Sequence, residues 1–104
     1  MVILDLKDYL RPEHITDGII GVLTDSGKIE MQEFDNKERQ VFNISINING
    51  TEYIWTMNKR TQMNLDAKWG KDTTNWVNKK VKINIIKQNV FGQVRDVLYG
   101  TPAE

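Results

Sequence analysis

The chain has 104 residues, no cysteine and a formal net charge of zero. This length is enough for one domain with a modest core and too short for two, so we expect a single domain over residues 1–104. The absence of cysteine excludes disulfides and thiolate metal sites, and with no secretory signal pattern it favours a cytoplasmic location. No apolar run approaches the ~20 residues of a membrane span, so we expect no membrane partner.

The charges are distributed unevenly along the chain. Residues 1–58 hold ten acidic and five basic side chains, whereas residues 59–104 hold four acidic and nine basic ones. A protein without net charge can carry a basic face when its charges are separated in this way. A solvated surface with no binding role explains the same numbers, so this pattern leaves both interpretations open.

The N-terminal third of the chain predicts a short helix or turn and then one long strand. Residues 3–10 are amphipathic and are followed by a proline, which stops a helix. Residues 18–34 contain two apolar patches on either side of a turn or bulge at residues 24–27, which would bend a single strand. The polar residues 35–38 then form a loop.

The next stretch has the pattern of a β-hairpin. Residues 41–48 alternate strictly, with apolar side chains at each even-numbered position, which is typical of a strand with one buried face. Asn49-Gly50 is the preferred dipeptide of a two-residue hairpin turn, so we expect residues 51–57 to fold back onto this strand.

The clearest helical pattern in the chain follows this hairpin. Asn58 is a suitable N-cap and Gly70 a suitable C-terminal stop. Thr61, Leu65 and Trp69 fall on one helical face, which we expect to pack against the body of the protein.

Two further strands follow a short turn after the helix. Asp72 can cap a turn that places Trp76 against the core. Residues 80–89 alternate again, residues 89–92 turn the chain, and residues 94–99 pair back antiparallel.

Three strands, one helix and two strands are the element order of an OB-type barrel. We therefore predict a mainly β fold, a five-stranded OB-like barrel over about residues 15–100, in which the helix between the third and fourth strands plugs one open end. Trp69 and Trp76 belong to the core in this arrangement.

A longer pattern in the second half of the chain resembles a known group of proteins. The pattern is Asn58…Leu65…Trp69-Gly70-x-Asp72-Thr73-x-x-Trp76-x-x-Lys79-x-Val81…Val90-Phe91-Gly92. It is similar to one in small prokaryotic, phage and archaeal proteins with an OB-like barrel, which are mostly uncharacterised; some are treated as single-stranded nucleic-acid-binding proteins by fold analogy. The resemblance covers about residues 5–102 and is best in 58–95. Asn78 and Gln93 depart from it, since they replace the usual Gly and Lys at two turns.

The sequence argues against an enzyme. His14 is the only histidine, and without cysteine this excludes a histidine-based triad and a multi-histidine metal site. The acid pairs Glu30/Glu33 and Asp35/Glu38 lie in or beside expected loops, where solvated carboxylates are the rule. We expect no catalytic residue, no metal and no cofactor.

Binding of single-stranded nucleic acid, with DNA favoured, is the functional hypothesis that has a mechanism. Proteins that bind single strands on this fold combine aromatic stacking on the barrel face with basic side chains that follow the phosphates. The candidate binding residues are Phe34, Arg39, Tyr53, Trp55, Lys59, Arg60, Phe91 and Arg95.

Two alternatives remain open at this point. Tyr53, Trp55 and Met57 share one strand face, and that face could be the inward set of a small barrel rather than a stacking platform. Apolar residues on both faces of the 41–57 hairpin also fit a protein–protein adaptor or a homodimeric structural subunit. The partner is then a protein or a second copy of the chain.

Overall fold

The structure, a computed structural model, describes residues 8–34 and 36–103, apart from the side chains of Phe34 and Val90. The described residues form a mainly β protein with one seven-stranded sheet. The strands are β1 (Asp8–Tyr9), β2 (Ile19–Leu23), β3 (Lys28–Phe34), β4 (Lys37–Ile48), β5 (Thr51–Met57), β6 (Lys80–Val90) and β7 (Gln93–Pro102). The helices are η1 (Pro12–His14), α1 (Lys59–Trp69) and η2 (Thr73–Trp76). No helix among these residues is long and apolar enough to cross a bilayer.

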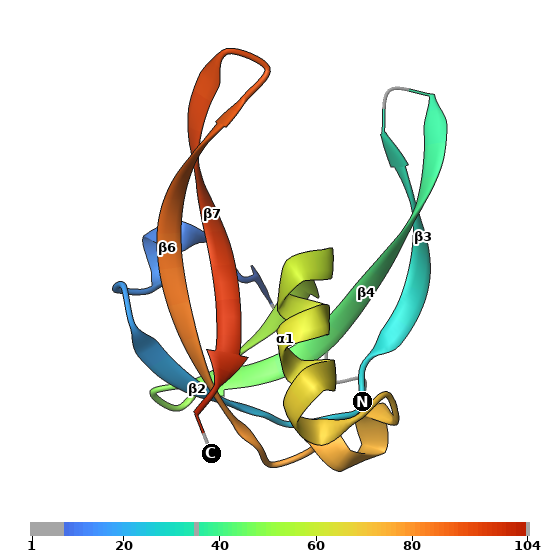
Figure 1. The fold of residues 1–104 in the computed structure, drawn as a ribbon, viewed down its shortest axis with the longest axis vertical. Coiled ribbons are helices and arrows are strands. Elements are labelled where there is room, and N and C mark those ends of the chain that lie inside the picture. Colours follow the sequence, from blue (N-terminus) through green and yellow to red (C-terminus); the bar gives the residue numbers. More distant parts are fainter. Residues whose placement is uncertain (1–7, 35, 104) are drawn as a thin grey trace, which may run out of the picture.

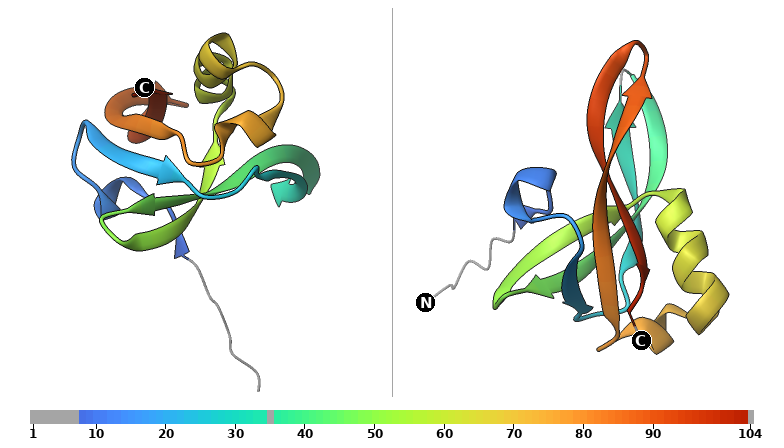
Figure 2. Two further views of the ribbon diagram at one scale, coloured as in Figure 1. Left: turned by 90° about the horizontal axis from the view of Figure 1, so that it is seen from below. Right: turned by 60° about the vertical axis from the view of Figure 1, so that its left-hand side comes forward.

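The sheet curls into a half-barrel. Its strand order is β1-β5-β4-β2-β6-β7, and β3 lies beside the first half of β4. All strand pairs are antiparallel except β1 and β5. Two hairpins, β3–β4 and β6–β7, rise on either side of α1 (Figure 1). Figure 2 shows that α1 and η1 lie on opposite sides of the sheet.

The predicted strand count of five is wrong, in part because the segment expected to be one bent strand forms two. Residues 24–27 separate β2 from β3, and both pair with the same edge of β4. The Asp25 carboxylate holds this bend, because its Oδ1 accepts hydrogen bonds from the backbone N–H of Gly27 (2.9 Å) and of Ser45 (3.1 Å). The bend itself is therefore confirmed.

The other additional strand is β1, at a position predicted to be helix or turn. Residues 3–7 of the predicted helix or turn lie outside the described residues. Asp8 and Tyr9 are extended and pair in parallel with β5, and the N–H of Leu10 donates to Ile54 O at 2.8 Å. The helical interpretation is wrong for these two residues because the edge of β5 offers them backbone partners.

Within the described residues the sheet does not close into a barrel, because β7 pairs only with β6. Side chains from the start of α1 take the place of a strand partner along the other edge of β7. Asn58 Nδ2 donates to Leu98 O (2.9 Å), and Asn64 Nδ2 donates to Gly100 O (3.0 Å). Thr61 Oγ1 accepts from Gly100 N–H (3.0 Å). The helix thus covers a strand edge that would otherwise be exposed.

The core follows the predicted alternation closely. The even-numbered apolar residues of β4, including Ile44 and Ile46, are buried, and so are Thr61 and Leu65 on the inward face of α1. Trp76 is buried beside Phe42 and donates from Nε1 to Gly70 O at 2.9 Å. The complete apolar core consists of Leu10, Leu23, Phe42, Ile44, Ile46, Ile48, Trp55, Met57, Leu65, Trp76, Val81 and Ile83.

Candidate functional site

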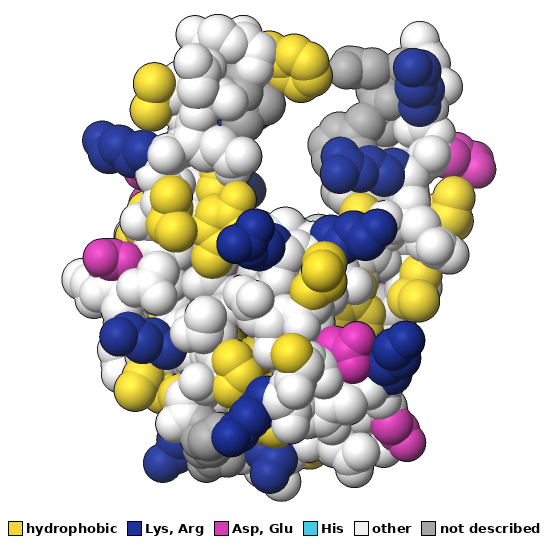
Figure 3. All heavy atoms as spheres, viewed as in Figure 1, with side chains coloured by type: hydrophobic (Ala, Val, Ile, Leu, Met, Phe, Trp, Pro, Cys, Tyr) yellow, Lys and Arg dark blue, Asp and Glu magenta, His cyan; other side chains and the backbone are white. Residues whose placement is uncertain are grey.

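The outer parts of the two hairpins stand apart from the rest of the sheet. β4 pairs with β5 only from Phe42 onward, and β6 pairs with β2 only as far as Ile83. Residues 29–34, 36–41 and 84–98 therefore project on either side of the first turn of α1 (Figure 1). The space-filling view shows the gap between them open to solvent (Figure 3). We call this space the inter-hairpin cleft; the hairpins are its walls, and the first turn of α1 is its floor.

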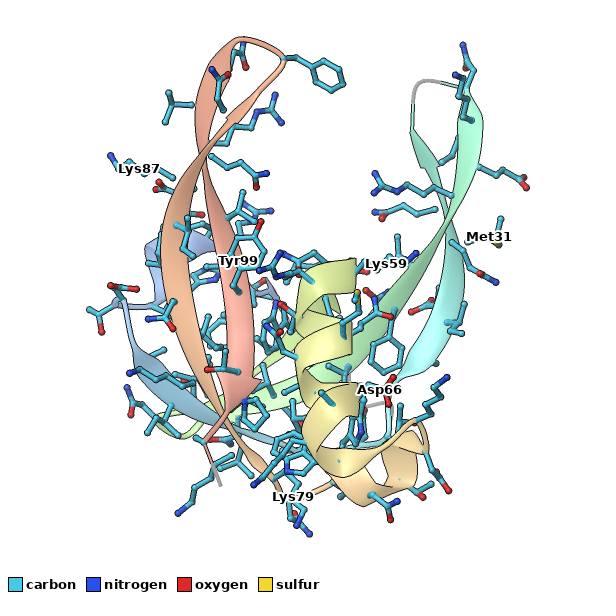
Figure 4. The ribbon with its side chains drawn as sticks, viewed as in Figure 1. Met31, Lys59, Asp66, Lys79, Lys87 and Tyr99 are labelled. Atoms are coloured by element: carbon cyan, nitrogen blue, oxygen red, sulfur yellow. The ribbon has the colours of Figure 1, made fainter. Side chains whose placement is uncertain are left out.

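The β3–β4 wall separates its charges by face. The Met31 side chain points away from the cleft (Figure 4). Successive residues of a strand point to opposite faces, and directly paired residues of antiparallel strands share a face. The adjacent pair Gln32↔Arg39 therefore faces the cleft, and the next pair, Glu33↔Glu38, faces outward with Met31. Its outer part presents a guanidinium inward and two carboxylates outward. The exception is Glu30, nearer the base, which shares the face of Arg39 and accepts a hydrogen bond from Asn43 Nδ2 at 2.8 Å.

The β6–β7 wall also turns a guanidinium inward, but its outer face carries one cation and one anion. Lys87 points away from the cleft (Figure 4) and pairs with Asp96, so Asp96 shares this outer face. The adjacent pair Gln88↔Arg95 faces the cleft. Tyr99 lies on the same inner face, because its hydroxyl donates to Gln88 Oε1 at 2.9 Å. This wall presents a second guanidinium and an aromatic ring to the cleft.

Two further cations lie on the floor, at the start of α1. Lys59 sits at the end of the helix that points into the cleft (Figure 4). Arg60 leans toward the β6–β7 wall, where it lines an open pocket of about 370 Å³. The partial positive charge of a helix N-terminus adds to both side chains. The residues that line this pocket are Arg60, Asn64, Asn84, Ile86, Tyr99 and Thr101.

The cations of the cleft are exposed and have no carboxylate partner in the described part of the chain. The ion pair that the described residues form, Arg11 with Glu13 at 3.6 Å, lies on the exposed surface outside the cleft. Figure 3 shows several Lys and Arg side chains around the gap, while the acidic side chains visible in this view lie on the outer flanks or below the gap. Arg39, Lys59, Arg60 and Arg95 thus form an unneutralised cationic lining that favours an anion.

Each hairpin is held at its base by an aspartate beside β2. Asp17 Oδ1 accepts from the N–H of Ile85 (2.8 Å) and from Asn84 Nδ2 (3.3 Å). The backbone hydrogen bond from Ile85, and then that from Asn84, lower the pKa of Asp17 below its usual 3.8. Asp25, at the other end of β2, accepts from the N–H of Ser45 on β4. The base of each wall is therefore held by an aspartate carboxylate that accepts a backbone N–H.

Five of the eight sequence-predicted residues belong to the cleft or its rim. Four of them are the cations described above, and Phe91 is at the tip of the β6–β7 hairpin with its side chain fully exposed. Sequence reasoning missed Tyr99 and the glutamines of the inner faces. The alternation of the last two strands could have indicated Tyr99 and Gln88, because position 99 shares a face with positions 84, 86, 88 and 95.

The other three predicted residues do not line the cleft as stacking residues in this structure. Trp55 is only 2% exposed and lies in the core, so its prediction as a stacking residue is wrong and the inward alternative is correct. Tyr53 is half-buried and stacks on His14, with ring centroids 4.9 Å apart. Phe34 belongs to β3, but its side chain lies outside the described residues.

No group of three or more His, Cys, Asp or Glu side chains in residues 8–34 and 36–103 is arranged to hold a metal ion. No protein-family model, no curated protein and no solved structure matches the chain. The family resemblance of the sequence stays a prediction.

Proposed function

We propose that the protein binds single-stranded nucleic acid, with DNA favoured, in the inter-hairpin cleft, and that it does so without catalysis. The observation that carries this proposal is the sorting of charge. Arg39 and Arg95 lie on the inner faces of the walls, and Lys59 and Arg60 lie on the floor. Glu33, Glu38 and Asp96 are on the outer faces, the last of them beside Lys87, and Glu30 near the base is a carboxylate on the inner face. A polyanion that enters the cleft meets cations on three sides.

The groups between these cations favour a single strand over a compact anion. Tyr99 offers a half-exposed ring, and glutamine and asparagine side chains lie beside it. Bases stack on aromatic rings with roughly 1–3 kcal/mol each, and only unpaired bases expose the faces that this requires. A single strand therefore uses both the charges and the ring.

The proposal includes an OB-like assignment of the half-barrel. The bent β2–β3 segment, β4, β5, α1, β6 and β7 follow one another as the strands and helix of that fold do. The two walls then correspond to the loops that join the first two and the last two strands, and OB folds use these loops to bind oligonucleotides. The cleft lies where this fold would place a ligand.

The test is a titration of fluorescein-labelled oligo-dT, followed by fluorescence anisotropy. Binding should be measurable at low salt and should weaken as salt rises, because cations that neutralise phosphates release counterions. With four cations the slope of log K against log salt should approach −3, at about −0.7 for each phosphate of a single strand. A duplex of the same length should bind less tightly. Absence of binding at micromolar protein in low salt would exclude the proposal.

A protein–protein adaptor or homodimer is the second candidate. Ile29 and Met31 on β3 are 65% and 60% exposed, and β3 pairs on one edge only within the described residues. Exposed strand edges with apolar side chains are sites at which other chains add. Light scattering that gives a dimer mass for the wild type and a monomer mass for Met31→Lys would favour this candidate.

A further inference from the structure

Two hairpins of the sheet turn through the same backbone geometry with different residues. Asn49-Gly50 joins β4 to β5 with φ values of 53° and 87°. Phe91-Gly92 joins β6 to β7 with φ values of 50° and 79°. Both turns are two residues long and left-handed at both positions, which is the geometry that prefers Asn-Gly. The first turn has the preferred residue, and the second has a phenylalanine in its place.

Neither the backbone nor the packing explains Phe91. A bulky residue with positive φ is a conformational outlier, since its Cβ crowds the neighbouring peptide. Burial of the ring would compensate for this, but Phe91 has an exposed fraction of 101%. The chain thus keeps a strained backbone and a fully hydrated ring at one position. Such outliers gather where a ligand is bound.

The position of Phe91 indicates which ligand group it contacts. It is at the tip of the wall whose inner face carries Arg95 and Tyr99, so a strand held by the cleft cations passes below it. Asn89, Gly92 and Gln93 beside it are polar or small, and Val94, which is 70% exposed, adds one apolar side chain, so the tip offers a lipid surface a small apolar area. A single ring beside cations is the arrangement that stacks on one base of a flexible strand.

We propose that Phe91 stacks on an unpaired base of the strand bound in the cleft, and that the turn is kept strained for this contact. This inference rests on the proposed function. It predicts that replacing Phe91 raises the stability of the fold and lowers the affinity for the strand. The reason is that the same side chain strains the backbone and contacts the ligand.

The test is Phe91→Asn, which recreates the Asn-Gly turn found at residues 49–50. We expect a higher melting temperature and a loss of oligo-dT affinity of about 5- to 100-fold in the anisotropy titration. Phe91→Trp keeps an aromatic ring and should keep the affinity. Inorganic polyphosphate has charge but no bases. Its inhibition constant in competition with oligo-dT should be the same for the wild type and Phe91→Asn.

The outcomes separate this inference from the proposed function. If the wild type does not bind oligo-dT, the proposed function fails, and the inference fails with it. If the wild type binds and Phe91→Asn binds equally well, the inference alone is wrong. Equal losses for oligo-dT and polyphosphate would show that the ring only positions the hairpin. Binding to phosphatidylserine vesicles that Phe91→Asn abolishes, with unchanged oligo-dT affinity, would assign the ring to a membrane and overturn the inference.

Discussion

Gly100 of β7 packs directly against the indole of Trp55 on β5. A Cβ at position 100 would lie 2.5 Å from Cη2 of Trp55 and 2.9 Å from Cγ2 of Thr61. This contact joins two strands that do not pair with each other in the described sheet. The absent side chain therefore allows the half-barrel to curl around this core tryptophan.

Gly100→Ala should destabilise the protein by about 1–3 kcal/mol, since an added methyl group must displace the ring or the helix. Urea unfolding followed by circular dichroism measures this change. Thr101→Ala, at the exposed next position of the same strand, is the control and should change stability little. An unchanged unfolding midpoint for Gly100→Ala would contradict the tight packing.

Trp55→Ala should cost about 3–5 kcal/mol of folding free energy, because it removes a large buried side chain. Met31→Ala, at a site that is 60% exposed, should stay within roughly 0.5 kcal/mol of the wild type. Chemical denaturation of both variants gives the comparison. A variant of Trp55 with unchanged stability and reduced oligonucleotide binding would restore Trp55 as a stacking residue.

Thr61→Val should destabilise the protein by about 1–3 kcal/mol although it keeps the shape of the side chain, because the buried N–H of Gly100 loses its acceptor. Amide hydrogen exchange of Gly100 should become faster in this variant. Thr61→Ser keeps the hydroxyl and should keep the protection of that amide. Equal exchange rates in the wild type and Thr61→Val would show that the hydrogen bond does not hold the strand edge.

Arg39→Glu should weaken oligo-dT binding about tenfold or more at low salt and should reduce the salt slope, since it replaces a cleft cation by an anion. Lys87→Glu makes the same charge change on the outer face of the other hairpin and should have a much smaller effect. Equal losses in the two variants would mean that net charge, rather than the cleft, governs binding.

The Asp17 carboxylate should make stability depend on pH in the acid range. Its pKa in the folded protein is below the usual 3.8, so its stabilisation is present above pH 3.8 and is lost as the pH falls through the folded value. Asp17→Asn should therefore be less stable than the wild type near neutral pH, and the difference should shrink with acidification. Urea unfolding at several pH values measures this. A difference that grows as the pH falls would contradict the assignment.

Local signals in the sequence predicted the parts of the fold that depend on neighbouring residues. Asn58 caps α1 by accepting from the N–H of Thr61 at 2.8 Å, as its residue type indicates. The alternation of β4 identified the face that enters the apolar core, but not the burial of Asn43 and Ser45 on the opposite face. The second hydrogen bond of Asn58, to Leu98 O, joins residues 40 positions apart, and no local pattern contains it. The open seam of the sheet follows from such contacts and could not be predicted.

The sequence indicated several residues of the candidate site, but it did not indicate how they are arranged in space. Arg39 and Arg95 were named from residue type and position, but their approach across the cleft depends on the twist of two long hairpins. Alternation groups residues by face and does not say which face is inward. For Trp55 the pattern therefore allowed both a stacking residue and a core residue, and its burial in the structure shows that it is a core residue.

The five residues of β2 are joined to both walls, since they pair with β4 on one side and with β6 on the other. Both walls therefore extend from strands that meet in the same short strand, and the proposed binding residues lie toward their far ends. A slight change in the twist of β2 would become a larger displacement at the tips of the two hairpins. The width of the opening would therefore follow the geometry of a strand that lies outside the cleft.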